Sequence, residues 1–61
     1  MRFRELDKLA KKQGWYEVDQ EGSHHHYKHP TKPGKLTIPE HANKDINIKT
    51  ANNILRFIGL K

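Results

Sequence analysis

The 61-residue chain contains no cysteine, so neither a disulfide nor a thiolate-bound metal is available to hold its fold together. A domain of this size buries only about 60% of the surface that its unfolded chain exposes. The fold therefore rests on a thin core drawn from the 33% of residues that are hydrophobic. We expect one domain spanning residues 1–61, without a deep cavity. Because small secreted domains usually depend on disulfides, we also expect a cytoplasmic protein.

Basic residues outnumber acidic ones, which suggests an anionic partner. The chain has 12 Lys+Arg against 7 Asp+Glu, a formal net charge of +5 with neutral histidines. Nucleic acid is the simplest such partner, but charge alone does not identify it, because attraction to phosphates is independent of sequence. No apolar run approaches the roughly 20 residues that span a bilayer, and the first residues lack the apolar segment of a signal peptide. We therefore expect no membrane partner.

Two segments have the apolar periodicity of amphipathic helices. Residues 3–13 form the first, and Gly14 follows at a position typical of helix ends. The second is predicted from about residue 49 to residue 58, and either Asn47 or Thr50 caps it. The apolar faces are Phe3, Leu6, Leu9 and Ala10 in the first helix and Ala51, Ile54, Leu55 and Ile58 in the second.

Three short strands are predicted between the helices, at residues 15–19, 23–29 and 35–39. Residues 20–22 form the first turn, and Pro30 ends the second strand because proline cannot donate to a ladder. Residues 40–47 are a polar connection to the second helix. We expect one of Trp15 and Tyr16 in the core rather than stacked on bases. Two residues near the connection either complete the core or form a patch for a partner protein: Ile46 and Ile48.

The order α-β-β-β-α with short turns between strands predicts an α+β fold whose three-stranded sheet is an antiparallel meander. Two helices packed on one face of such a sheet bury that face and leave the other in water. Any chemistry on the open face must therefore be done by exposed side chains.

Four of the five histidines lie within six residues of one predicted strand: His24, His25, His26 and His29. Strand side chains alternate between faces, which divides this segment into two sets. Tyr27 has the largest apolar body, so we assign its set to the core and the other set to solvent as a basic row. The core set is Ser23, His25, Tyr27 and His29, and the solvent set is His24, His26 and Lys28.

Three interpretations of the solvent row compete. Histidine titrates at about pH 6.5, so it can transfer protons at cellular pH, as RNA cleavage requires, and a nearby lysine can stabilise the developing charge. His24 and His26 could instead share a metal ion, but two imidazoles without a spaced carboxylate or cysteine make no structural site, so we predict no metal. The third interpretation is a polar face without special function.

One segment, Gly22-Ser23-His24-His25-His26-Tyr27-Lys28-His29-Pro30, resembles the signature strand of the HicA-type toxins of bacterial toxin–antitoxin systems. Three further stretches resemble the same family in the right order, and together they cover nearly the whole chain. They are Leu6 through Lys12-Gln13-Gly14-Trp15, Leu36-Thr37-Ile38-Pro39 with His41, and Ile48 through Ile54-Leu55-Arg56 to Gly59-Leu60.

The resemblance implies a fold similar to double-stranded-RNA-binding domains and the activity of an mRNA interferase, a ribonuclease toxin. It also implies a HicB-type antitoxin that binds the toxin and masks its active site. The family uses one histidine on this strand. His24 matches the Gly-Ser-His motif, and His25 is the fallback because adjacent histidines leave the alignment ambiguous by one residue.

We therefore predict a metal-independent endoribonuclease without a cofactor, in which His24 transfers a proton during cleavage of mRNA. The side chains expected to contact the RNA are Ser23, His26, Lys28, Lys11, Lys12 and Lys35. The alternative is a non-catalytic module that binds double-stranded RNA, which would spread basic residues over a helix N-terminus and a loop. The second helix here is rich in asparagine and carries Arg56 near its end, which argues against that alternative.

Overall fold

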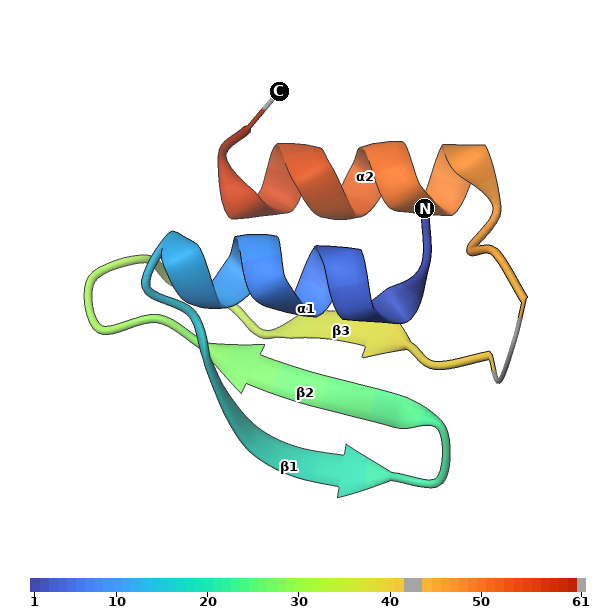
Figure 1. Ribbon diagram of the computed structural model, residues 1–61. Helices are drawn as coiled ribbons and strands as arrows, with labels where there is room; N and C mark the ends of the chain where they lie inside the picture. The colour runs from blue at the N-terminus through green and yellow to red at the C-terminus, as the bar shows by residue number, and fades with distance from the viewer. Residues whose placement is uncertain (42–43, 61) are drawn as a thin grey trace.

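The predicted order of elements is present in the computed structural model, which describes residues 1–41 and 44–60. The elements are α1 (Phe3–Lys12), β1 (Tyr16–Glu21), β2 (His24–Lys28), β3 (Leu36–Pro39) and α2 (Ile48–Ile58) (Figure 1). Asn47 caps α2, because its side-chain oxygen accepts a hydrogen bond from the backbone N–H of Lys49 at 2.8 Å. Residues 42–43 of the predicted polar connection lie outside the described residues. Of the helices described, none has the length and apolarity needed to cross a membrane.

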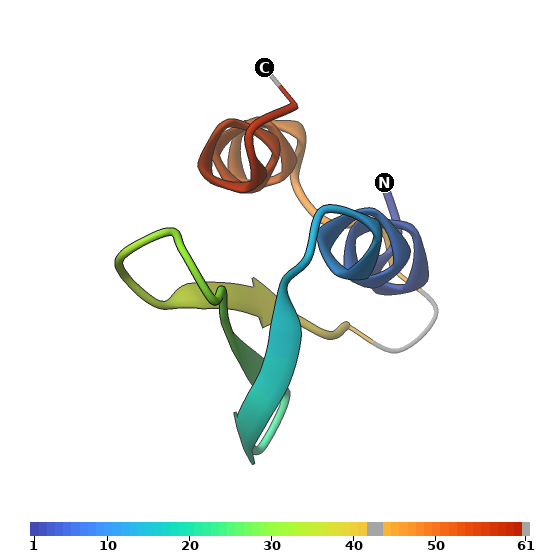
Figure 2. The ribbon, with the colours of Figure 1, turned by 90° about the vertical axis from the view of Figure 1, so that its left-hand side faces the viewer.

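The three strands form one antiparallel sheet in the order β1-β2-β3, and both helices lie on the same side of it (Figures 1 and 2). This confirms the predicted α+β fold. Figure 2 shows the β1–β2 hairpin turning away from the helix layer, so that its far end is the part of the sheet most distant from both helices. Every residue of β1 is exposed, whereas three of the five residues of β2 are buried.

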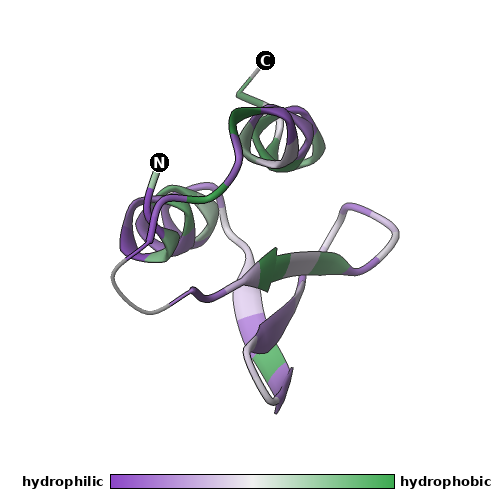
Figure 3. Ribbon diagram, turned by 90° about the vertical axis from the view of Figure 1, so that its right-hand side faces the viewer, coloured by the Kyte–Doolittle hydropathy of each residue, from purple (hydrophilic) through white to green (hydrophobic). Residues whose placement is uncertain are grey.

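The core lies between the helices and the central part of the sheet. Its largest fully buried side chains are Trp15, Tyr27, Leu6, Ile38 and Ile58. Trp15 is therefore the aromatic residue that joins the core, while 48% of Tyr16 is exposed. Ile46 is buried and completes the core, whereas 76% of Ile48 is exposed. Figure 3 shows the same division, with β3 largely hydrophobic and the projecting hairpin mostly hydrophilic.

The first turn lies later in the chain than the sequence predicted. Instead of turning at residues 20–22, β1 continues to Glu21, and Gly22 and Ser23 form a two-residue turn. Gln20 and Glu21 pair with His25 and His24 across the hairpin, and the register shifts between Glu17 and Asp19. Such a β-bulge accommodates one extra residue in β1. The longer strand places Glu21 directly opposite His24.

We predict that Gly14→Ala destabilises the fold more than Gly22→Ala. Both glycines have positive φ, +95° and +57°, a conformation that costs other residues roughly 1–2 kcal/mol. A Cβ on Gly14 would also lie 2.7 Å from Nε2 of His29, whereas nothing lies within 4 Å of one on Gly22. The His29 ring cannot easily move, because its Nε2 bonds the carbonyl oxygen of Gln13 at 2.9 Å. Gly14→Ala should therefore lower the free energy of unfolding by about 2–4 kcal/mol.

Urea unfolding followed by circular dichroism measures both variants against the wild type. Equal losses of stability would contradict the assigned clash between position 14 and His29.

Candidate active site

His24 lies at the start of β2 and is exposed. Because side chains alternate along a strand, it points to the face of the sheet opposite the helices. The turn before it is bonded to the segment that follows β3, since the backbone N–H of Glu40 donates to the carbonyl oxygen of Ser23 at 2.6 Å. Pro39 lies opposite His24 on β3. An open imidazole is thus held on a backbone that is paired on both sides.

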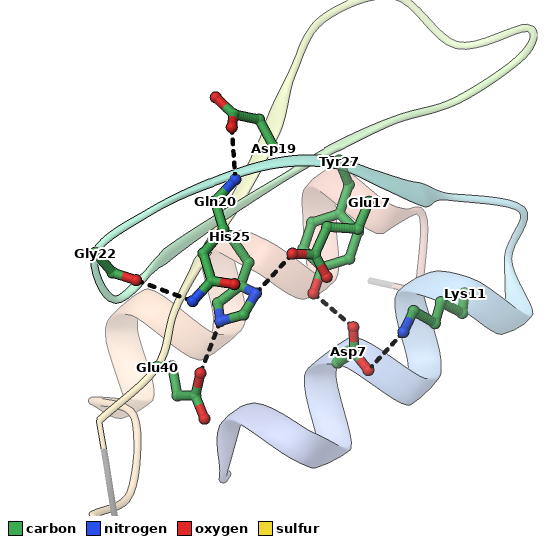
Figure 4. A network of polar contacts seen from close by, with 9 residues as sticks. All are labelled: Asp7, Lys11, Glu17, Asp19, Gln20, Gly22, His25, Tyr27 and Glu40. Carbon is green, nitrogen blue, oxygen red and sulfur yellow. Dashed lines mark hydrogen bonds and ion pairs between the residues drawn. The ribbon is translucent and has the colours of Figure 1, made fainter.

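His25 points the other way and is buried, with 7% of the residue exposed. Its Nδ1 lies 2.9 Å from Oε2 of Glu17, and its Nε2 lies 2.7 Å from Oε1 of Glu40 (Figure 4). The ring also packs against Phe3 of α1, with 4.3 Å between ring centroids. Burial by itself lowers the pKa of His25, but hydrogen bonds and charges from both carboxylates outweigh it and raise the pKa above its usual 6.5. With both nitrogens occupied, His25 is poorly placed to reach a substrate.

Tyr27 ties the same strand to the first helix. Its buried hydroxyl donates to Oδ1 of Asp7 at 2.5 Å, and Asp7 also pairs with Lys11 at 3.1 Å (Figure 4). Burial and the neighbouring Asp7 carboxylate raise the pKa of Tyr27. The hydroxyl therefore stays protonated, and β2 is held against α1 by a neutral donor and a charged acceptor.

The expected exposure of His26 is wrong. The alternation places His26 on the face of His24 as predicted, but only 8% of the residue is exposed. Side chains from both neighbouring strands enclose it. Its Nδ1 lies 2.9 Å from Oγ1 of Thr37 on β3, and its Nε2 lies 3.0 Å from Oε1 of Glu21 on β1. The sequence shows which side of a strand a residue takes, but not how far its neighbours cover it.

The predicted RNA contacts divide between two sides of the molecule. Lys28 is exposed on β2 and shares the face of His24. Lys11 and Lys12 lie on α1, in the helix layer. Lys35 is exposed just before β3, beside a hollow of about 270 Å³ between β3 and α2. The sheet face therefore unites Lys28 with His24 and His26 and leaves the other lysines elsewhere.

Sequence reasoning missed the acidic residues that surround the histidines. Glu17, Glu21 and Glu40 all bond a histidine of β2. The inward orientation predicted for His25 gave a general signal, because a buried imidazole needs hydrogen-bond partners, but it did not show which carboxylates would supply them. In residues 1–41 and 44–60, no group of three or more potential ligand side chains is arranged to hold a metal ion.

A comparison with models of protein families matches the chain to the family described as the HicA toxin of bacterial toxin–antitoxin systems. The match covers residues 3–60, which include all the helices and strands. A search of curated proteins finds no significant match.

We predict that His25→Gln destabilises the protein most at mildly acidic pH. A raised pKa in the folded state contributes stability that is complete below the unfolded value of about 6.5 and is lost as pH rises through the folded value. His25→Gln should lower the free energy of unfolding by roughly 1–3 kcal/mol near pH 6, because hydrogen bonds to charged partners are lost. The difference from wild type should shrink towards pH 9.

Urea unfolding at several pH values tests this, with His24→Gln as the control on the exposed neighbour. The control should change stability by less than about 0.5 kcal/mol. A constant deficit of His25→Gln across the pH range would show that the imidazole is not held as a charged group.

Proposed function

The chain belongs to the HicA toxin family of bacterial toxin–antitoxin systems, and from that membership we propose that it is an endoribonuclease that cleaves mRNA. We propose further that a HicB-type antitoxin neutralises it and that the reaction needs no metal. The observation that carries the proposal is the exposed His24 imidazole on the open face of a sheet whose other face is buried.

The geometry of β2 favours His24 over His25 as the proton-transfer group. His25 gives both ring nitrogens to carboxylates and is covered by Phe3. The His24 side chain has no hydrogen bond or ion pair to any other described residue, so its ring nitrogens remain accessible to a ligand. Since a general acid or base must come within hydrogen-bond reach of the reacting oxygen, the exposed ring is the better candidate.

The open face suits a polymeric substrate. A domain with a thin core has no deep pocket, but RNA can lie along a surface and be held by its phosphates. Lys28, at the other end of β2 and on the same face, adds a positive charge to that face. The net charge of +5 draws RNA towards the protein without selecting a sequence.

We predict that His24→Ala abolishes RNA cleavage and growth arrest while the protein remains folded. Loss of a general acid or base lowers cleavage by about 10²–10⁴-fold. Purified protein is incubated with a labelled single-stranded transcript, with and without a chelator, and with a duplex of the same length. Cleavage should persist in the chelator.

His25→Gln separates the two histidines in the same assay and should retain cleavage in proportion to its folded fraction. If His25→Gln is inactive and His24→Ala is active, His25 is the catalytic group. If wild-type protein binds the duplex and cuts neither substrate, the protein is a double-stranded-RNA-binding module instead.

We predict that Lys28→Gln weakens RNA binding more than Lys12→Gln, because only Lys28 shares the face of His24. Binding of a short single strand is measured by fluorescence anisotropy in the His24→Ala background at several salt concentrations. Losing one phosphate contact should reduce the slope of log affinity against log salt by about 0.7. Equal effects of the two substitutions would place the RNA across α1 as well.

A further inference from the structure

Acid–base cleavage of RNA moves two protons, and the proposed function accounts for one of the groups that move them. One group takes the proton from the attacking 2′-hydroxyl, and another gives a proton to the leaving 5′-oxygen. His24 can do one of these, so a second proton-transfer group is expected within reach of the same phosphate.

Glu21 occupies the position directly across from His24. The two residues are register partners in the β1–β2 pair, on either side of the two-residue turn. Side chains of directly opposed residues lie on the same face of the sheet, with Cβ atoms about 4.5–5.5 Å apart. The Glu21 side chain is 74% exposed, so substrate can reach it as it can reach His24. No hydrogen bond or ion pair joins the two side chains among those of the described residues.

The buried His26 ring holds one carboxylate oxygen of Glu21, and the other oxygen has no partner among the described residues. A carboxylate only accepts hydrogen bonds, so Nε2–H of His26 donates to Oε1 of Glu21 at 3.0 Å. Nδ1 of the same ring lies 2.9 Å from Oγ1 of Thr37 on β3. Because His26 is 8% exposed and bonded on both sides, it fixes the direction of the Glu21 side chain. No interaction of the second carboxylate oxygen with a described residue is present.

The other nearby carboxylates are less well placed. Glu17 and Glu40 bond His25 and lie on the helix side of the sheet. Asp19 shares the face of Glu21, but it pairs with His26 in the register, and its Oδ1 accepts from the backbone N–H of Gln20 at 2.8 Å. Glu21 is therefore the acidic residue that faces His24.

We propose that Glu21 is the second catalytic residue, acting as the general base opposite His24 as the general acid; this inference rests on the proposed function. Its carboxylate takes the proton of the 2′-hydroxyl, whose oxygen forms a bond to the adjacent phosphorus. The bond between phosphorus and the 5′-oxygen breaks, and that oxygen takes a proton from the His24 imidazolium. The products are a 2′,3′-cyclic phosphate and a 5′-hydroxyl, and exchange with water returns each proton.

The test compares Glu21→Gln with Asp19→Asn, which removes the same charge from the same strand and face. A glutamine at position 21 can still accept the hydrogen bond from His26, but it cannot take a proton. We expect Glu21→Gln to lower single-turnover cleavage by about 10²–10⁴-fold and to remove the acidic limb of the pH–rate profile. Asp19→Asn should lower the rate less than about tenfold, because exposed charges act through screened electrostatics.

Glu21→Asp retains a carboxylate and should restore part of the rate, even if the glutamine variant folds poorly by circular dichroism. The wild-type protein should leave uncut an RNA that carries a 2′-deoxyribose at the cleaved position, because the attacking hydroxyl is then missing. The assignment of Glu21 fails if wild type cleaves, His24→Ala does not, and Glu21→Gln matches Asp19→Asn in rate and pH profile. The proposed function fails separately if wild type does not cleave RNA or if neither His24→Ala nor His25→Gln lowers its rate.

Discussion

The contact between His25, Glu17 and Glu40 is the interaction on which the rest of the structure depends. It joins β2 to β1 on one side and to the segment after β3 on the other, and Phe3 of α1 covers it. Tyr27 adds a second link from the same strand to α1 through Asp7. In a domain with so little apolar core, these polar links fix the position of the helix layer on the sheet. The His25 ring and the Tyr27 hydroxyl are buried, and each of their polar atoms has a partner.

Holding His25 inward has a direct effect on its neighbour. Since alternate residues of a strand face opposite sides, an inward His25 requires an outward His24. The contact that stabilises the fold therefore also sets the orientation of the proposed catalytic group. The same alternation places His26 outward, where Thr37 and Glu21 enclose it and where it holds the carboxylate opposite His24. Three adjacent histidines thus have three different environments: exposed on the open face, buried between two carboxylates, and buried between a hydroxyl and a carboxylate.

Much of the fold follows from local patterns in the sequence. The periodicity of Leu6 and Ala10, the glycine after α1 and the strand-forming run around Tyr27 predict the elements and their order, because these signals act over a few residues. The end of β1 could not be predicted, since Glu21 and Gly22 both suit a turn and the bulge near Val18 depends on pairing with β2. The burial of His26 and the carboxylates around β2 depend on cross-strand contacts, which one strand's composition does not contain. His24 could be identified from its motif, but its partner Glu21 required the register.

Strand β1 is fully exposed, so most of its positions can change without disturbing the residues that maintain the fold. Apart from Glu17 and Glu21, which bond histidines, its side chains contribute little to the interior. Substitutions at exposed positions such as Tyr16 and Val18 therefore alter the surface beside the open face at little cost in stability. In evolutionary terms, β1 is where a new preference could arise without a new fold.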